Sequence, residues 1–333
     1  MSANNSVIQI SNLSKSYFVP EREAGLKAAV QSLVRRKTRE VKAVDHITFN
    51  IGSGEIVGFL GPNGAGKTTT LKMLSGLLYP TSGQLSVLGH LPEKRQPNFL
   101  RQITLVMGNR NQLVWDLPGL DSFELQRAIY AIPEAEFKKT RDEFIELLEL
   151  KDLVRKPVRN LSLGERMKME FAVALLHRPK MLFLDEPTLG LDVTMQRRLR
   201  EFVAEYNRRH GATVLLTSHY MADVEALCKR VIVIHHGQIL FDGDLSKLVE
   251  RFSSYKTIGM TLDNPMVDLS AYGEVGGQDG GRVTLRVPKA ETSRVTARLL
   301  ADLTVADLTV EDTPIDDVIE RVFALEKPKE AAT

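Results

Sequence analysis

Apolar residues fall into short continuous runs, several of which end directly at glycine or at a polar side chain. Such runs lie at Glu55–Leu60, Ile103–Met107, Met181–Leu184 and Thr213–Leu216. Runs of this length without helical spacing predict buried strands. Because continuously apolar strands are typical of parallel sheets, we expect an α/β fold that binds its ligands at the carboxyl ends of the strands.

A second set of segments has apolar residues at helical spacing. They are Thr69–Leu78, Asp121–Tyr130, Pro133–Leu150 and the stretch from Leu161 to Leu176. In Pro133–Leu150 the expected buried face consists of Phe137, Phe144, Leu147 and Leu148. Because the last three segments are consecutive, we expect a helical subdomain at about residues 110–178, inserted between two strands of the sheet.

The N-terminal part combines extended segments with an insertion. The expected strands are Val7–Ile10, Asn12–Phe18, Val41–Ile51 and Gln84–Leu88, and the insertion spans about residues 21–42. One helical face of the insertion is apolar and its end is basic, through Leu26, Val30, Leu33 and Val34 followed by Arg35, Arg36, Lys37, Arg39 and Lys42. Such a helix suits an anionic membrane surface or a partner. The alternative is a helix that packs on its own domain, with its charges in water.

After Gly243 the pattern changes to short alternating elements. Helices are predicted at Leu245–Phe252, Ser293–Leu300 and Pro314–Leu325, strands at Lys256–Leu262, Arg282–Val287 and Val305–Val310, and a glycine-rich turn at Gly276–Gly281. We expect a small α+β accessory domain at residues 245–326 and a disordered tail at residues 327–333. The domain has no catalytic constellation, so its expected role is to bind a regulator or a second subunit, or to brace a dimer.

Composition narrows the possible functions. The 333 residues carry a formal net charge of +2, which argues against a general nucleic-acid binder. No apolar run approaches the roughly 20 residues needed to cross a bilayer, and the polar start Met1–Asn5 lacks a signal-peptide core. The single cysteine, Cys228, excludes an internal disulfide and is typical of a reducing compartment.

The most specific motif directly follows the first apolar run. It consists of Gly61, Pro62, Asn63, Gly64, Ala65, Gly66, Lys67 and Thr68, which fit G-x-x-x-x-G-K-[ST]. Glycines let the backbone curl so that several N–H groups point into one concavity, and the N-terminus of the next helix adds positive charge there. We expect Lys67 to reach the outer phosphates of a nucleotide and Thr68 to place its hydroxyl on Mg²⁺.

Two carboxylates, Asp185 and Glu186, directly follow the third apolar run. At the end of a parallel strand, Asp185 is positioned to hold Mg²⁺, directly or through water. Glu186 is positioned to orient or deprotonate a water molecule. His219 ends another apolar run, where a structural histidine is the simpler interpretation. His235 and His236 do not indicate a metal site, because no cysteine or acidic cluster accompanies them.

Two predicted helices begin with small polar residues, and one predicted strand carries the aromatic residue Tyr17. In Leu161–Glu165 a serine and a glycine could bind an anion through a hydroxyl, N–H groups and the helix dipole, although a plain N-cap is the simpler interpretation. Gly190–Asp192 precedes another helix, for which Asp192 is the expected N-cap. Tyr17 is either an ordinary strand aromatic or a platform on which adenine stacks.

The order of these motifs is more informative than any of them alone. Residues from about Val7 to Gly243 resemble the nucleotide-binding domain of an ATP-binding cassette (ABC) transporter. The resemblance implies an α/β P-loop NTPase domain over residues 1–244, with a helical signature subdomain and an antiparallel β-subdomain.

The resemblance also implies roles for individual residues. It assigns ATP contacts to Tyr17, to Gly61–Thr68 (Walker A) together with Thr69, and to Ser162 and Gly164 of the signature motif. It assigns Mg²⁺ binding to Thr68 and Asp185, the catalytic base to Glu186, the D-loop to Gly190–Asp192 and the γ-phosphate sensor to His219.

Two motifs depart from the family pattern. In the signature, usually LSGGQ, Leu163 stands in place of a glycine and Glu165 in place of a glutamine. In the Q-loop, Asn109 lies where the glutamine is expected by register, and Gln112 is the alternative; either would offer an amide to metal-bound water. Trp115–Pro118, just beyond, would contact the coupling helix of a transmembrane partner.

The implied mechanism needs a head-to-tail homodimer in which the signature motif of one copy completes the ATP site of the other. Within the family, the chain most resembles ATPase subunits of ABC-2 type exporters, which act with a separate transmembrane permease subunit on the cytoplasmic face of the membrane. One alternative is a soluble ABC ATPase of translation or DNA repair, against which stand the single phosphate loop and the absence of sustained heptads. Another is a non-catalytic nucleotide binder, against which stand Asp185, Glu186 and His219.

Overall fold

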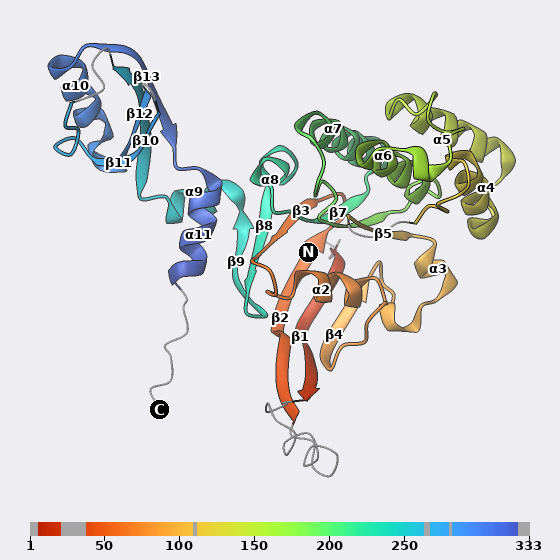
Figure 1. The fold of residues 1–333 in the computed structure, drawn as a ribbon. Helices are drawn as coiled ribbons and strands as arrows, with labels where there is room; N and C mark the ends of the chain where they lie inside the picture. Colours follow the sequence, from red (N-terminus) through yellow and green to blue (C-terminus); the bar gives the residue numbers. More distant parts are fainter. Residues whose placement is uncertain (1–5, 21–37, 109–111, 263–266, 280–281, 326–333) are drawn as a thin grey trace, which may run out of the picture. The chain divides into compact units, whose positions relative to one another are not determined.

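The computed structural model describes residues 6–20, 38–108, 112–262, 267–279 and 282–325 (Figure 1). The chain divides into two compact units, Met1–Gly243 and Asp244–Thr333. Each unit has its own sheet and its own core, and the two are described separately. Among the described residues, no helix is long and apolar enough to cross a membrane.

The first unit contains a six-stranded sheet in the order β5-β6-β7-β3-β8-β9. Its strands are β3 (Ile56–Leu60), β5 (Ile103–Met107), β6 (Met181–Asp185), β7 (Thr213–Thr217), β8 (Arg230–His235) and β9 (Gln238–Asp244). The pairs β5–β6, β6–β7, β7–β3 and β3–β8 are parallel, so the predicted parallel sheet is confirmed. A two-residue turn, His236 and Gly237, joins β8 to β9, and both residues have positive φ, as the turn of a tight hairpin requires.

A second, antiparallel sheet has the order β2-β1-β4, with β1 at Ser6–Pro20, β2 at Thr38–Gly52 and β4 at Ser82–Val87. The expectation that β2 begins at Val41 is wrong, because Thr38 and Arg39 already pair with Pro20 and Val19 of β1. The first residues of β2 are exposed, so no buried apolar alternation marked them in the sequence. Residues 38–42 therefore belong to a strand, and the rest of the predicted insertion, residues 21–37, lies outside the described residues.

The main helices of the first unit are α2 (Lys67–Leu74), α4 (Gly119–Tyr130), α5 (Glu134–Leu147), α6 (Leu163–Ala174), α7 (Val193–His210) and α8 (Met221–Leu227). Short helical turns lie at Pro92–Lys94, Pro97–Leu100 and Val158–Asn160. Helices α4, α5 and α6 gather on one side of the six-stranded sheet (Figure 1). The core contains side chains from α2 and from both sheets, and Phe49 of β2 meets Phe59 of β3 with ring centroids 5.9 Å apart.

Two helix predictions were wrong in detail. Helix α2 ends at Leu74 rather than at Leu78, because Gly76 has a φ of 71° and leaves the helical region. A Cβ at Gly76 would lie 2.3 Å from the carbonyl oxygen of Pro92, so a side chain there is excluded. In α5, Phe137 and Phe144 are buried as expected, but Leu147 is 39% exposed and is not part of the buried face.

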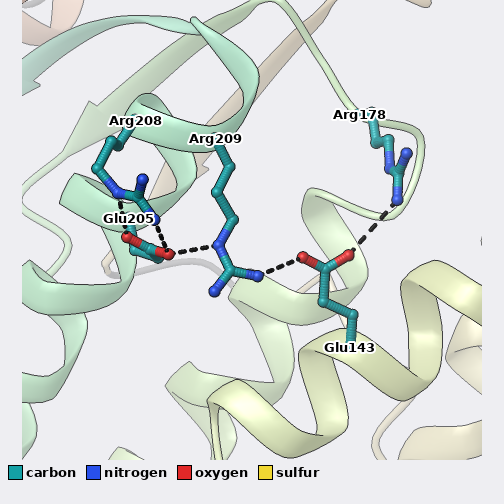
Figure 2. A network of polar contacts seen from close by, with 5 residues as sticks. All are labelled: Glu143, Arg178, Glu205, Arg208 and Arg209. Carbon is teal, nitrogen blue, oxygen red and sulfur yellow. Dashed lines mark hydrogen bonds and ion pairs between the residues drawn. The ribbon is translucent and has the colours of Figure 1, made fainter.

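An ion-pair network ties α5 to the end of α7 (Figure 2). Glu143 of α5 accepts from Arg209 of α7 at 2.9 Å and from Arg178 at 3.5 Å. Glu205 of α7 accepts from Arg208 at 2.7 and 2.6 Å and also from Arg209. These two guanidinium groups lower the pKa of Glu205 to about 2. Because the network lies at the surface, its ion pairs stabilise the contact between α5 and α7 only modestly.

The second unit contains an antiparallel sheet in the order β11-β12-β10-β13. Its elements are α9 (Leu245–Phe252), β10 (Tyr255–Leu262), β11 (Glu274–Asp279), β12 (Arg282–Pro288), a helical turn at Lys289–Glu291, α10 (Thr292–Asp302), β13 (Val305–Asp312) and α11 (Ile315–Leu325). Its core contains Ile258, Met260 and Leu285 of the sheet and Leu299 of α10.

The glycine-rich turn predicted at Gly276–Gly281 is wrong in part, because Gly276 and Gly277 lie in the edge strand β11. The register of β11 against β12 shifts between Val275 and Gly277, as in a β-bulge. An edge strand needs only one paired side, which lets glycines of low strand propensity remain in it.

Candidate functional site

The loop at residues 61–66 joins the carboxyl end of β3 to the N-terminus of α2, and its glycines are required by close backbone contacts. A Cβ at Gly61 would lie 2.3 Å from the carbonyl oxygen of Ile234. Gly66, the N-cap of α2, has a φ of 109°, and a Cβ there would lie 2.4 Å from the carbonyl oxygen of Ala43. The loop is therefore held against β8 and β2 by its backbone, which leaves no room for larger residues at these two positions.

Inside this loop, the backbone turns tightly and presents the start of a helix. Gly64 has a φ of 80°, and Ala65 donates its N–H to the carbonyl of Pro62 at 3.1 Å, which leaves Asn63 at the tip of the turn. The first N–H groups of a helix have no intrahelical acceptor, and here they belong to the turn that begins at Lys67 and includes Thr69. Such N–H groups and the helix dipole together form an anion-binding concavity.

The ammonium group of Lys67 belongs to this concavity. The side chain is buried, and its Nζ donates to the carbonyl oxygens of Gly61 at 2.5 Å and Pro62 at 3.1 Å. Burial lowers the pKa of Lys67, and the nearby carboxylates of Glu186 and Asp185 oppose that shift. The loop thus holds its own cation at its centre, within reach of an anion bound on the N–H groups.

Three oxygen-bearing side chains meet at the ends of β6 and β7 and the start of α2. The carboxylate of Asp185 accepts from the hydroxyl of Thr68 at 2.8 Å through Oδ2, and from the hydroxyl of Thr217 at 2.7 Å through Oδ1. Hydroxyl and carboxylate oxygens are the ligands that Mg²⁺ prefers, so Thr68 and Asp185 fit this ion. Sequence reasoning missed Thr217, although its place as the polar residue that ends an apolar strand was a usable signal.

Glu186 and His219 form the next pair outward from this strand end. Nε2 of His219 lies 2.8 Å from Oε1 of Glu186. The backbone N–H of Glu186 is shared between the carbonyl and the hydroxyl of Thr217, each at 3.1 Å. Glu186 has a φ of 53°, a conformation that non-glycine residues rarely adopt and that is enriched at functional sites. A Cβ at Gly108 would lie 2.2 Å from the carbonyl oxygen of Glu186, so the residue that follows β5 also approaches this turn closely.

Of the two residues proposed for the amide near the metal, Asn109 lies outside the described residues. Gln112 is described, and its side-chain amide donates to the carbonyl of Leu105 in β5 at 2.8 Å. Its backbone N–H donates to the carboxylate of Glu170 on α6 at 2.9 and 3.0 Å. The NH₂ group of Gln112 is therefore engaged by β5, the strand that precedes it. Sequence reasoning missed Glu170 as the anchor of this segment.

The start of α6 is built as a capping box, and this explains one departure in the signature. Ser162 is the N-cap; its hydroxyl accepts from the N–H of Glu165 at 3.3 Å, and the carboxylate of Glu165 accepts from the N–H of Ser162 at 2.8 Å. A Cβ at Gly164 would lie 2.9 Å from Cγ of Met195 in α7. Leu163, the other departure, is 39% exposed. Among the described residues, no hydrogen bond or ion pair joins Ser162 or Gly164 to the loop at residues 61–68.

We expect Glu165→Ala to destabilise the first unit by about 1 kcal/mol, which lowers its melting temperature by about 2–4 °C. Glu165→Gln is the matched control, because glutamine can close the same capping box. The N–H of Ser162 lowers the pKa of Glu165 below its usual 4.5. The carboxylate of Glu165 therefore stabilises the folded state above about pH 4.5, and this stabilisation is lost as the pH falls through the lower pKa that the group has in the folded protein. Calorimetry at pH 7 and below pH 4 checks this; equal melting temperatures for the two variants at pH 7 would contradict it.

Two further sequence predictions concern Asp192 and Tyr17. Asp192 is the N-cap of α7 and accepts from the N–H of Met195 at 2.9 Å, which confirms the predicted cap. Tyr17 of β1 is 40% exposed and pairs with Val41 of β2, two residues before the carbonyl of Ala43 that touches the loop. The Nζ of Lys15 lies 5.3 Å from the centre of its ring. Tyr17 thus presents an accessible ring on the strand pair that borders the loop.

Comparison with known proteins gives matches to both units. Residues 44–189 match the family described as ABC transporter, and residues 254–311 match the EvrA-like ABC transporter, C-terminal domain. The chain is 35% identical to the ABC transporter ATP-binding protein NatA of Bacillus subtilis, over 64% of this chain and 87% of NatA. It is 34% identical to the bacitracin transport ATP-binding protein BcrA of Bacillus licheniformis, over 68% of this chain and 73% of BcrA.

Solved structures agree in fold. An ATP-binding subunit of an ABC transporter superposes with a TM-score of 0.62 at 25% identity, over 74% of this chain and 93% of that one. A dimeric post-hydrolysis state of the ATP-binding cassette MJ0796, bound to ADP and phosphate, superposes with a TM-score of 0.59 at 23% identity, over 72% of this chain and 98% of that one. The predicted α/β fold with an antiparallel β-subdomain and a C-terminal α+β unit is confirmed.

Proposed function

The chain belongs to the family of ABC transporter ATP-binding proteins, and from this premise we propose that it hydrolyses ATP to drive an exporter whose membrane-spanning part is a separate subunit. One observation carries the proposal: Nε2 of His219 lies 2.8 Å from Oε1 of Glu186, directly beside the hydrogen bond between Thr68 and Asp185. Phosphoryl transfer needs a cation near the phosphates, oxygen ligands for Mg²⁺ and a carboxylate that orients water. Lys67, the pair Thr68 and Asp185, and Glu186 with its partner His219 supply these groups.

ATP binding rests on the loop and on the strand ends around it. The N–H groups at the start of α2 and the ammonium of Lys67 bind the β- and γ-phosphates, and the exposed ring of Tyr17 stacks on adenine. Mg²⁺, held by Thr68 and Asp185, would neutralise charge on the phosphate oxygens when it is bound.

In hydrolysis, the water that attacks the γ-phosphorus is oriented by the carboxylate of Glu186, which accepts its proton. The bond from the γ-phosphorus to the bridging oxygen breaks, and ADP and phosphate are released. His219 holds Glu186 and contacts the γ-phosphate, so that loss of this phosphate changes the contact. Positive charge from Lys67 is already in place as negative charge develops on the transferred group, which is the arrangement that lowers the barrier most.

The active assembly is a head-to-tail dimer. Ser162 and Gly164 lie at the N-terminus of α6, where N–H groups and the helix dipole favour an anion, yet the described side-chain hydrogen bonds of Ser162 are with Glu165 of the same helix. A second copy brings its own Ser162 and Gly164 to the γ-phosphate and so completes the site. ATP then lies between the two copies, and hydrolysis lets the dimer open.

The membrane partner is expected to dock on the segment after β5. Val114, Trp115 and Leu117 are 41%, 48% and 44% exposed, an unusual cluster of large apolar side chains at a surface. Arg166 of α6 lies over the ring of Trp115 at 5.5 Å, so movement of α6 reaches this surface directly. Relatives of this chain include the bacitracin transport protein BcrA and the linearmycin resistance protein LnrL, which supports export as the direction of transport.

We expect two inactive variants to restore activity to each other if the site is shared between copies. Lys67→Ala damages the phosphate loop, and Ser162→Arg damages the surface given to the partner. In an equimolar mixture, half of the dimers are mixed, and each mixed dimer has one intact site, so about one quarter of wild-type ATPase activity returns.

The control mixture combines Lys67→Ala with Glu186→Gln. Both changes lie on the same side of the shared site, so no mixed dimer has an intact site and no activity returns. ATPase rates of each variant alone and of both mixtures give the answer, with melting temperatures to show that each variant is folded. Recovery in both mixtures, or in neither, would contradict the head-to-tail arrangement.

A further inference from the structure

Asp223 of α8 is a buried carboxylate that takes no direct part in the proposed hydrolysis. Its residue is 1% exposed, and its two oxygens accept three hydrogen bonds from side chains. Oδ2 accepts from the hydroxyl of Thr188 at 2.5 Å and from the hydroxyl of Ser218 at 2.8 Å, and Oδ1 accepts from Nη1 of Arg200 at 2.7 Å. A buried charge survives only with such partners, so this arrangement is specific rather than incidental.

The partners of Asp223 belong to the two chain segments that carry the reacting pair. Thr188 follows Glu186 by two residues, after the end of β6, and Ser218 directly precedes His219, after the end of β7. Thr188 and Ser218 are both buried, and Asp223 is a nearer acceptor for the hydroxyl of Ser218 than the carbonyl oxygen of Tyr220, at 2.8 Å against 3.2 Å. One carboxylate oxygen therefore fixes the distance between the turn that follows Glu186 and the turn that carries His219.

Asp223, Thr188 and Ser218 together form a hydrogen-bonded cluster, here called the clamp. The third partner of Asp223, Arg200, connects the clamp to α7. Arg200 is 15% exposed at its side chain and lies two turns after Asp192, the N-cap of α7. Its guanidinium donates to Oδ1, which leaves Oδ2 of Asp223 to accept from both hydroxyls. A hydrogen bond from a guanidinium is shorter and stronger than one between neutral groups, so it holds Asp223 firmly in place.

We propose that Asp223 is a positioning residue that holds Glu186 and His219 in contact through Thr188 and Ser218. This inference deepens the proposed function and rests on it, because it concerns the geometry of the same hydrolytic pair. Glu186 has a strained backbone, with a φ of 53°, and such a conformation persists only where surrounding contacts enforce it. Asp223 supplies contacts of this kind through the hydroxyls of Thr188 and Ser218.

The test is Asp223→Asn, which keeps the shape of the side chain. Asparagine replaces one acceptor oxygen with an NH₂ group, so it cannot accept from Arg200 and from both hydroxyls together. We expect kcat for ATP hydrolysis to fall about 10- to 100-fold, because small displacements of a catalytic group have effects of this size. The KM for ATP should change little, because the phosphate loop and Thr68 are untouched.

Two controls separate positioning from loss of folding. Val224→Ala alters the neighbouring residue, which is fully buried, and should lower the melting temperature while kcat stays near wild type. Thr188→Val removes one hydroxyl of the clamp and should lower kcat. Thr188→Ser keeps the hydroxyl, so kcat should stay near the wild-type value. If Val224→Ala lowers kcat as much as Asp223→Asn, or Thr188→Val leaves kcat unchanged, the positioning role is wrong.

A double variant tests whether Asp223 acts through Glu186. In single-turnover measurements, Asp223→Asn should have little further effect on the residual rate of Glu186→Gln, because the group it positions is already lost. A full additional loss would contradict the proposal. Wild-type protein without any ATPase activity would overturn the proposed function instead, whereas active wild-type protein with an equally active Asp223→Asn variant would overturn only the role of Asp223.

Discussion

Glu186→Gln is expected to lower kcat for ATP hydrolysis by about 10² to 10⁴, the range that removal of a general base produces. Glutamine keeps the size of the side chain and can still accept from His219, whose Nε2 lies 2.8 Å from Oε1 of Glu186. It cannot accept the proton of the attacking water. Binding should remain, because Lys67, Thr68 and Asp185 are unchanged. ATP should therefore accumulate between two copies, and the variant should run as a dimer with ATP and as a monomer with ADP.

The measurements are steady-state ATPase rates and size-exclusion chromatography with light scattering. Glu201→Gln is the matched control, because Glu201 lies on α7 with its side chain 69% exposed and takes no part in the site. It should hydrolyse ATP at the wild-type rate and should not be trapped as a dimer. Near wild-type hydrolysis by Glu186→Gln would show that another group accepts the proton. If Glu186→Gln has no ATPase activity but stays monomeric with ATP, the shared site would be contradicted, whereas the role of Glu186 as general base would not.

The central sheet could be predicted from the sequence because its buried strands are short runs of mainly apolar residues. Ile103–Met107 was predicted with the bounds that the structure has, and the predicted run Met181–Leu184 ends one residue before β6 does. The predicted strand end at Asp185 and Glu186 followed from the rule that parallel strands present their carboxyl ends along one edge. Burial by neighbours on both faces leaves little freedom in such a strand, so local sequence and tertiary structure agree.

Prediction failed where pairing or distant contacts decide the outcome. Thr38 and Arg39 are in a strand because β1 pairs with them, and Gly276 and Gly277 because β12 does, although neither segment has strand-like composition. The clamp at Asp223 was also invisible, since its partners lie 5, 23 and 35 residues away along the chain. A lone aspartate in a helix gives no signal until the fold brings these donors together.

Lys67→Ala is expected to weaken ATP binding by about 10- to 100-fold, because a hydrogen bond to a charged group contributes roughly 1.5–3 kcal/mol. The ammonium already lies inside the phosphate loop, 2.5 Å from the carbonyl oxygen of Gly61 and 3.1 Å from that of Pro62. Burial lowers the pKa of Lys67, so the folded protein holds this charge at some cost without nucleotide. Its removal should therefore leave the melting temperature of the nucleotide-free protein within about 4 °C of wild type.

Lys72→Ala is the control for this variant, since Lys72 lies in the last turn of the same helix, away from the loop. A fluorescent ATP analogue titrated into both variants should show weak binding for Lys67→Ala and wild-type binding for Lys72→Ala. Equal affinities would show that the loop binds no phosphate through Lys67. If both variants bind poorly and melt early, α2 itself depends on its lysines and the loss says nothing specific about phosphate. Tight binding lost only with Lys67, at an unchanged melting temperature, is the result that follows from a cation held ready inside the glycine loop.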